Sequence, residues 1–142
     1  MRYWHINTYS MNNRKHMIKR NLCYIGLGND RNDYNQRLLK NKNTTPHQYN
    51  KFEENARKGD IILLYHNGEG HIAYGKYTGV IIEPNLYKDL APDWSNTEIQ
   101  KHIQVESWIR IENISMKYVR RQTLLEFKND PEKKFTELIS IK

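Results

Sequence analysis

Residues 60–83, with the sequence DIILLYHNGEGHIAYGKYTGVIIE, constrain the fold more than any other stretch of the chain. The apolar run at 61–65 is too densely hydrophobic for a half-exposed strand, which indicates a strand covered on both faces. The NGEG segment at 67–70 tolerates positive φ angles, so the chain can turn back and pair residues 72–77 with that run. The pattern predicts a β-hairpin in the core of the protein.

Further strands are predicted before and after this hairpin. Bulky and polar residues alternate over 3–9, which is typical of an opening strand, and residues 21–26 favour a second one. Residues 103–112 alternate again. Within the hairpin, Gly75 and Gly79 interrupt the returning strand, and such glycines often mark a bulge or sharp coiling. The sheet is therefore expected to curl.

Helices are expected at the margins of this sheet. Ser10 can cap a helix over residues 11–20. The sequence TPHQ at 45–48 contains a cap, a first-turn proline and a capping-box glutamine, which predicts a helix over 46–58. A short last helix is predicted after Asp130 and runs through Leu138.

Two segments are expected to be irregular, the polar tract 29–35 and the long segment 83–104. A loop as long as the second is more often functional than idle in a compact domain. Trp94 lies there in a polar, proline-flanked setting and is a candidate for ligand contact or for a lid over the core. Trp4 and Trp108 occupy strand positions, which favours the core.

Together these elements predict one α+β domain spanning residues 1–142, with about five strands in a curved or barrel-like sheet and two or three helices. There are 23 Lys and Arg against 16 Asp and Glu, a net charge of +7, which favours an anionic partner. The single cysteine excludes an internal disulfide, and no apolar run is long enough to span a membrane. We expect an intracellular, cytoplasmic protein, or a nuclear one in a eukaryote.

The order of these elements resembles the YTH and EVE families of the PUA-like fold, in which a partly open β-barrel has flanking helices. The resemblance covers residues 3 to about 121 and rests on YWHINTYS, NLCYIG, the hairpin NGEGHIAYGK, the loop tryptophan after it, and VESWI. The KGD sequence before the hairpin and the opening YW are closer to EVE and to the DNA-reading domains of modification-dependent restriction enzymes.

This resemblance implies a small pocket that takes one modified nucleobase, flipped or unpaired, between aromatic walls. YTH proteins bind adenine methylated on its exocyclic amine, and the EVE-like relatives accept methylated adenine or modified cytosine. By position, Thr8 and Tyr9 fall at the pocket end of the opening strand. Asn12 or Asn13 falls where YTH sequences place a side chain that contacts the base edge, and Trp94 matches the tryptophan that closes the cage.

The chain departs from the YTH pattern at the first cage tryptophan. That position aligns with Cys23, and only a shift of one residue brings Tyr24 there. Either Tyr24 forms the wall, or the pocket is narrower and differently lined. As the bound base, the resemblance implies N6-methyladenine first and modified cytosine next.

The chemistry of a methylated base fits aromatic walls. Stacking contributes ~1–3 kcal/mol per base, whereas burial of one methyl group contributes only about 0.8 kcal/mol, so a snug fit and a polar contact to the base edge are also needed. Two cationic sets are expected to bind phosphates and so position the nucleic acid without specifying the base. They are Arg14, Lys15, Lys19 and Arg20, and Lys117, Arg120 and Arg121.

No catalytic, metal-binding or cofactor motif is found in the sequence, so a non-catalytic reader without a cofactor is expected. His66 and His71 flank the hairpin turn without a carboxylate or thiol at ligand spacing, which favours solvated histidines over a metal site. The reader is either free-standing or the recognition domain of a restriction or defence system, and its partner is either DNA or RNA.

Two alternative functions stay open. A hydrolase on a PUA-like scaffold, acting on RNA or modified nucleosides, needs a buried acid or lysine with a strongly shifted pKa in the pocket. Lys76 and Glu106 are the nearest candidates, although exposed strand charges explain them more simply. A protein-binding adaptor would instead use the basic surface to meet an acidic partner.

Overall fold

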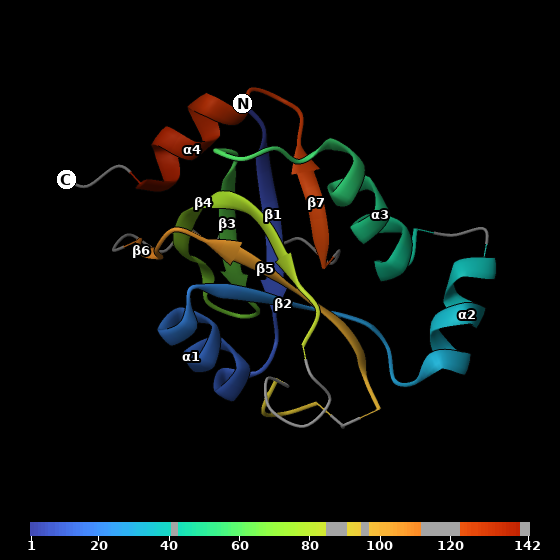
Figure 1. Cartoon of the computed structure of the whole chain (residues 1–142). Coiled ribbons are helices and arrows are strands. Elements are labelled where there is room, and N and C mark those ends of the chain that lie inside the picture. Colours follow the sequence, from blue (N-terminus) through green and yellow to red (C-terminus); the bar gives the residue numbers. More distant parts are fainter. Residues whose placement is uncertain (41–42, 85–90, 95–96, 112–122, 140–142) are drawn as a thin grey trace.

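The computed structural model describes residues 1–40, 43–84, 91–94, 97–111 and 123–139. The elements, labelled in Figure 1, follow the chain as β1 (Tyr3–Thr8), α1 (Met11–Arg20), β2 (Leu22–Gly28), α2 (Arg31–Leu39), α3 (Thr45–Asn55), β3 (Ile61–His66), β4 (Gly70–Ile82), β5 (Ile99–Val105), β6 (Ile109–Arg110), β7 (Leu124–Phe127) and α4 (Pro131–Ile139). This is the mixed α+β arrangement that the sequence predicts.

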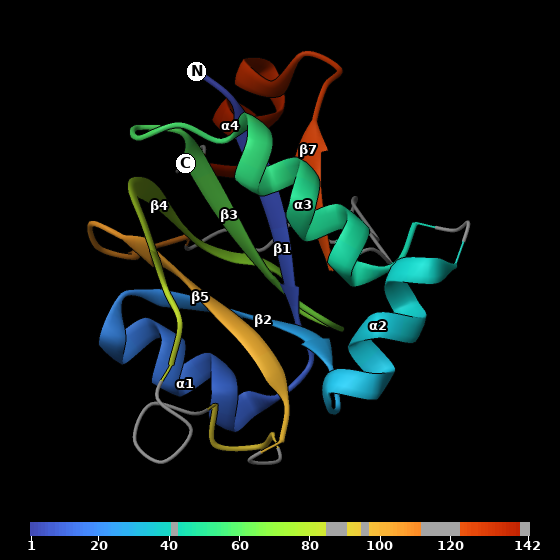
Figure 2. The same ribbon diagram turned by 45° about the vertical axis from the view of Figure 1, so that its right-hand side comes forward.

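The strands form one sheet of seven, in the order β2-β5-β4-β3-β1-β7, with β6 paired to β4. Of the strand pairs in the described part of the chain, β1 and β3 run parallel and the others are antiparallel. Among the described residues β2 and β7 do not pair, so the sheet is not closed. Figure 2 shows β2 running across the direction of β1, with α1 beneath it. The sheet is curved, as its glycines indicate.

Strand β3 is buried along its whole length, which confirms a strand covered on both faces. Ile62 and Leu64 contribute to the larger hydrophobic cluster, which also contains side chains of β1, β2, α3 and β5. Ile61 and Leu63 point to the opposite face and belong to a smaller cluster, on which Phe135 of α4 packs. In Figure 1, α4 lies beside the amino terminus.

Strand β4 changes partner along its length, pairing first with β3 and then with β5. Its register with β5 shifts between Tyr77 and Ile81, and Gly79 inside that shift has a φ of +86°. Gly75 pairs in register with Ile62, and a Cβ there would lie 3.0 Å from the Val105 Cβ of β5. The predicted bulge and coiling are confirmed at Gly79.

The helix boundaries differ in part from expectation. Ser10 caps α1 as predicted, its Oγ accepting the Asn13 N–H at 3.1 Å. The capping box predicted for α3 is wrong, because Thr44 is the N-cap without a side-chain bond. Gln48 instead accepts the Leu124 N–H at 2.9 Å, so it joins α3 to β7. The helix ends at Asn55, earlier than expected.

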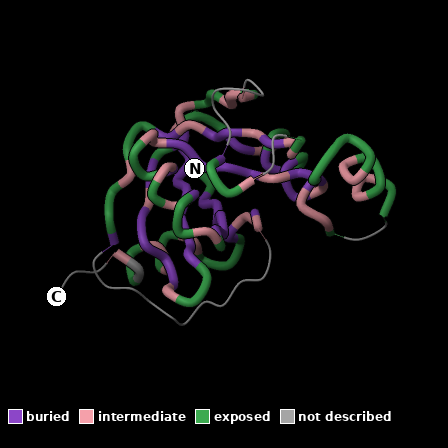
Figure 3. The backbone as a smooth tube through the Cα atoms, turned by 90° about the horizontal axis from the view of Figure 1, so that it is seen from below, coloured by how far each residue is buried: buried purple, intermediate pink, exposed green. Residues whose placement is uncertain are grey.

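The polar tract 29–35 is not a loop throughout, since α2 begins at Arg31. Asp30 caps it by accepting the Asp33 N–H at 2.8 Å, a local signal that the polar composition hides. Strand β2 also continues through Gly26 to Gly28. Helix α2 has no buried side chain, and it projects from the body in Figure 3. No helix of the described residues is long and apolar enough to cross a membrane.

The limits predicted for the strand over 103–112 are also wrong. Strand β5 begins at Ile99, inside the segment expected to be irregular, and ends at Val105. The chain then leaves the strand and joins β4 through the short strand β6. Trp108 lies at this break, and its indole N–H donates to the Met17 and Leu22 carbonyl oxygens at 3.2 and 3.3 Å. It packs against the core, as expected.

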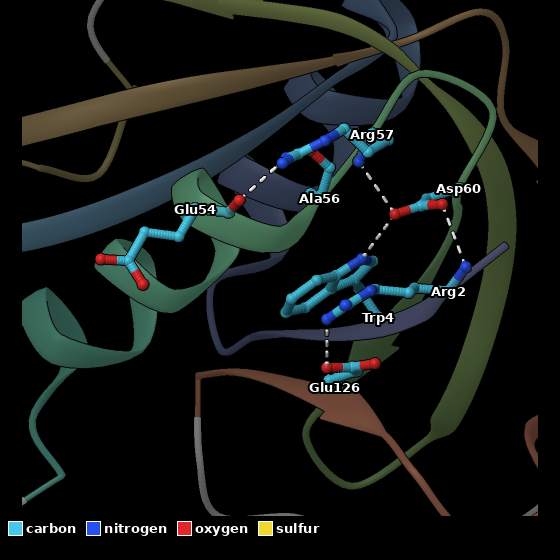
Figure 4. Close-up of polar contacts among 7 residues, drawn as sticks. All are labelled: Arg2, Trp4, Glu54, Ala56, Arg57, Asp60 and Glu126. Carbon is cyan, nitrogen blue, oxygen red and sulfur yellow. Dashed lines mark hydrogen bonds and ion pairs between the residues drawn. The ribbon is translucent and has the colours of Figure 1, made fainter.

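A buried carboxylate ties the start of β1 to the segment between α3 and β3 (Figure 4). Asp60 accepts hydrogen bonds from the Arg2 N–H at 3.0 Å, the Trp4 indole N–H at 3.2 Å and the Arg57 N–H at 3.0 Å. The Arg2 guanidinium reaches on to Glu126 at 3.2 Å. Trp4 is 2% exposed, so its assignment to the core is confirmed.

Candidate functional site

One face of β2 and β5 gathers aromatic and amide side chains around a glycine. Tyr24 and Gly26 alternate along β2, and they pair in register with His102 and Gln100 of β5. The Tyr24 ring lies on the His102 ring, with centroids 4.2 Å apart and planes at 35°. Gly26 has no side chain, and the Glu98 carboxyl and the Trp94 ring fill the space beside it, which we call the gap at Gly26.

The Tyr24 ring is fixed at its hydroxyl as well as at its face. The hydroxyl lies 2.6 Å from His16 Nδ1 and accepts a hydrogen bond from the Arg20 guanidinium at 3.2 Å. Burial, and then the nearby charges of Arg20 and Lys19, lower the pKa of His16. The neutral imidazole favoured by this pKa can accept the tyrosine proton. Tyr24 is therefore a buried ring that is held both at its face and at its hydroxyl.

The loop that carries Trp94 is attached to the amino-terminal end of α1. The Asp93 N–H donates to Asn13 Oδ1 at 3.0 Å, and the Asp93 carboxylate accepts from Asn12 at 3.1 Å and from the Ser10 hydroxyl. The bond from Ser10, and then that from Asn12, lower the pKa of Asp93. Asn12 and Asn13 therefore position the tryptophan loop in this structure.

The Trp94 ring is half-buried and lies against the gap at Gly26. Its Cη2 and Cζ2 atoms are 3.3 and 3.4 Å from the place where a Gly26 Cβ would stand. The Tyr24 and Trp94 centroids are 6.4 Å apart, with planes tilted by 59°. A base held between two rings needs nearly parallel planes about 7 Å apart, twice the carbon contact distance of ~3.5 Å. A base would therefore have to turn the Trp94 ring aside.

Glu98 reaches the same gap and was not predicted from the sequence. Its Oε1 is 2.6 Å from the position of a Gly26 Cβ. Burial raises the pKa of Glu98 to about 7, while Arg37 acts to lower it and Asp33 to raise it. Gln100, also missed, accepts from the Ala91 N–H at 3.2 Å, and its buried Nε2 has no hydrogen-bond partner among the described residues. Beginning β5 at its true start would have placed Gln100 opposite Gly26, with Glu98 directly before the strand.

The remaining predicted pocket residues do not all face this gap. Thr8 is buried at the end of β1, whereas Tyr9 is 59% exposed and its hydroxyl accepts from Asn7 at 3.1 Å. Cys23 is fully buried in the core, and burial raises the pKa of its thiol well above the usual value. Because neighbouring strand residues point to opposite faces, Tyr24 and Cys23 cannot both line one pocket.

The cations of α1 have different environments. Arg14 is ion-paired with Glu69 of the hairpin turn, while Lys15 and Lys19 are exposed. Together with Arg110 they line a groove of about 360 Å³ between α1 and strands β4 and β6. The second predicted set, Lys117, Arg120 and Arg121, lies outside the described residues.

The histidines of the hairpin are not solvated, which corrects the expectation from sequence. His66 is 7% exposed and His71 is fully buried, because the turn folds against β1. His71 Nε2 lies 3.0 Å from His5 Nδ1. Burial lowers the pKa of His66, and Arg14 lowers it further. Lys76 and Glu106, by contrast, are exposed, as the simpler interpretation expects.

Comparison with known proteins identifies the fold. No model of a protein family and no curated protein matches the sequence. The structure is similar to the YTH domain of Zygosaccharomyces rouxii MRB1 in complex with N6-methyladenosine RNA, with a TM-score of 0.60, 12% identity, and coverage of 99% of this chain and 88% of that one.

Two bacterial structures are similar at lower scores. PSPTO5229 from Pseudomonas syringae has a TM-score of 0.51 and 13% identity, covering 96% of this chain and 99% of its own. Atu2648 from Agrobacterium tumefaciens has a TM-score of 0.50 and 12% identity, covering 98% and 91%. The chain therefore has a YTH-like fold.

Proposed function

We propose that this protein binds nucleic acid and reads a modified base, N6-methyladenine first and modified cytosine next, in the site between Tyr24 and Trp94. The observation that carries the proposal is a half-buried tryptophan held by its loop beside a rigid tyrosine and over a glycine gap. The YTH-like fold supports it, since the similar yeast domain is in complex with N6-methyladenosine RNA.

The base enters this site when the Trp94 ring turns away from Gly26. The loop backbone keeps its bonds to α1, so the side chains that have to move are those of Trp94 and Glu98. Stacking on Tyr24 and Trp94 stabilises the bound base by ~1–3 kcal/mol per base, which offsets an unstacking cost of a few kcal/mol. The site therefore favours a base that is single-stranded or weakly paired. In this proposal the exposed Tyr9 contacts the entering nucleotide from the end of β1, whereas Thr8 is buried.

In this proposal the phosphates are bound first by the α1 cations that have no carboxylate partner among the residues that the structure describes. Of the α1 set, Lys15 and Lys19 are exposed, whereas Arg14 is paired with Glu69 and Arg20 holds Tyr24. The set at Lys117, Arg120 and Arg121 contributes further contacts in this proposal. The same chemistry serves DNA and RNA, in a free-standing reader or in the recognition domain of a restriction or defence system.

A binding titration tests the proposal. Single-stranded oligonucleotides that differ only in one N6-methyl group are titrated with the parent protein, Trp94→Ala and Trp94→Phe, and followed by fluorescence anisotropy. We expect tighter binding of the methylated oligonucleotide. Trp94→Ala should weaken it by about 5- to 150-fold, the equivalent of 1–3 kcal/mol, while Trp94→Phe keeps most of the affinity. Equal affinity for both oligonucleotides, or full affinity in Trp94→Ala, would contradict the proposal.

A hydrolase acting on RNA or modified nucleosides is a second candidate, and Glu98 is the observation that favours it. The pKa of this acid is raised to about 7 beside the candidate base site, which suits a general acid or base. Incubation with RNA and with methylated nucleosides, followed by chromatography, tests it. Turnover that Glu98→Gln abolishes supports an enzyme, and absence of turnover rules this candidate out.

A further inference from the structure

The gap at Gly26 is bordered by two polar groups whose hydrogen-bonding capacity is not used by the protein. The Glu98 carboxyl has no hydrogen-bond partner among the described residues, although its Oε1 reaches the glycine. The Gln100 Nε2 is buried and unpaired, while the Oε1 of the same amide is occupied by Ala91 and His102. Gln100 lies opposite Gly26 in the strand register. The Glu98 carboxyl therefore lies beside the Trp94 ring at this glycine, and Gln100 lies across the strand pair from it. Glu98 and Gln100 also line one cavity of about 350 Å³.

We propose that Glu98, in its neutral form and assisted by the Gln100 amide, reads the edge of the bound base and selects one with an amino group beside a ring nitrogen. This inference rests on the proposed function and names the class of base, which is adenine or cytosine. Guanine is disfavoured.

The selection follows from donors and acceptors. A neutral carboxyl presents one O–H donor next to one carbonyl acceptor. Adenine and cytosine present the complement, a ring-nitrogen acceptor beside an amino N–H that survives a single methylation. Guanine presents two adjacent donors along its pairing edge, which suit an ionised carboxylate instead. The spare Gln100 N–H adds a donor for a second acceptor on the base.

The surroundings of Glu98 keep about half of its carboxyl groups neutral at pH 7, and more below it. Burial is the main cause of its raised pKa, and the nearest cation, Arg37, is already paired with Asp33 at 3.1 Å. Lys101 is likewise paired with Glu83. The other charged or titratable groups that line the same cavity as Glu98 are Arg31 and Tyr34 of α2.

The experiment compares binding at several pH values for three proteins. The parent, Glu98→Gln and Glu98→Ala are titrated with an N6-methyladenine oligonucleotide between pH 5.5 and 8.5. About one carboxyl in thirty is neutral 1.5 pH units above its pKa, so parent affinity should fall by up to about 30-fold at pH 8.5. A glutamine offers a donor and an acceptor at every pH, so Glu98→Gln should bind without this dependence. Glu98→Ala should bind weakly throughout.

The outcomes separate this inference from the function on which it rests. A parent affinity that does not change with pH, or a Glu98→Ala protein that binds as well as the parent, overturns the role of Glu98 even if methylated and unmodified oligonucleotides are still distinguished. Failure to distinguish them at any pH overturns the proposed function itself.

Discussion

At the scale of single residues, Glu98 makes the stability of the fold depend on pH near neutrality. Its pKa is about 7 in the folded protein and about 4.3 in an unfolded chain, so the folded state binds more protons between these values. The unfolding free energy contributed by Glu98 is therefore fully retained below pH ~4.3. It decreases as the pH rises toward 7 and reaches its lowest value above 7.

We predict that the unfolding free energy of the parent protein falls between pH 5.5 and 8 by more than that of Glu98→Gln. Urea denaturation at the two pH values measures the difference. The comparison with glutamine is needed because burial lowers the pKa of His16 and His66, which acts in the opposite direction below pH ~6.5. If the unfolding free energies of the parent and of Glu98→Gln change equally with pH, the Glu98 carboxyl is not desolvated.

The two aromatic residues of the candidate site, Tyr24 and Trp94, are held in different ways. Tyr24 is fixed by His102 on one ring face and by two groups at its hydroxyl. Trp94 has a tethered backbone and a half-buried ring. In the proposed function, a fixed Tyr24 ring opposite a Trp94 ring that can turn lowers the entropy cost of binding a base while still allowing the base to enter.

At the scale of elements, the path of β4 decides where the site can form. This strand pairs with β3 over its first half and with β5 over its second, and the change of direction occurs around Gly79. Because β5 carries His102 and Gln100 against β2, the turn in β4 positions the whole face on which Tyr24 lies. The positive φ of Gly79, +86°, is the local condition for that turn.

We predict that Gly79→Ala lowers the unfolding free energy by roughly 1–2 kcal/mol, because an L-residue is strained at this φ. Gly79→Asn is the matched control, since asparagine tolerates the left-handed region better, and it should recover part of the loss. Chemical denaturation of both variants measures the effect. Equal stability of Gly79→Ala and the parent would mean that β4 can turn without a left-handed residue.

At the scale of the whole molecule, charge is distributed unevenly over the elements. The chain has a net charge of +7, and exposed cations of α1 meet Arg110 of β6 along one groove. Helix α4 lies at the opposite end of the molecule from α1 in Figure 1, so its lysines are remote from the candidate site. A single anionic strand near Trp94 would meet the α1 cations first.

We predict that the affinity for an oligonucleotide falls linearly with salt concentration on a logarithmic plot. The double variant Lys15→Ala with Lys19→Ala should reduce that slope by about 1–2, since each phosphate contact in a single strand contributes about 0.7. Lys133→Ala on α4 is the control and should leave the slope unchanged. If the double variant and Lys133→Ala change the salt slope equally, the oligonucleotide binds elsewhere on the surface.

Local patterns were sufficient for most of the fold. The hairpin at 60–83, the cap at Ser10 and the glycines of β4 act through nearest neighbours, and the structure agrees with each of them. The error at α2 was also local, because the Asp30 cap was present in the sequence but obscured by a polar composition. The misplaced limits of β5 had a larger effect, since they hid Glu98 and Gln100 from the expected site.

The sequence by itself determined the hairpin, the α+β class, the positive charge and the choice of Trp94 as a candidate ligand contact, because each depends on local spacing or on composition. Only the tertiary structure decided that Tyr24 and Cys23 face apart, that Asn12 and Asn13 hold a loop some 80 residues away, and that Glu98 reaches Gly26. These properties arise from burial and from contacts between distant segments, and such contacts exist only once the sheet has curled and brought β2, β5 and the tryptophan loop together.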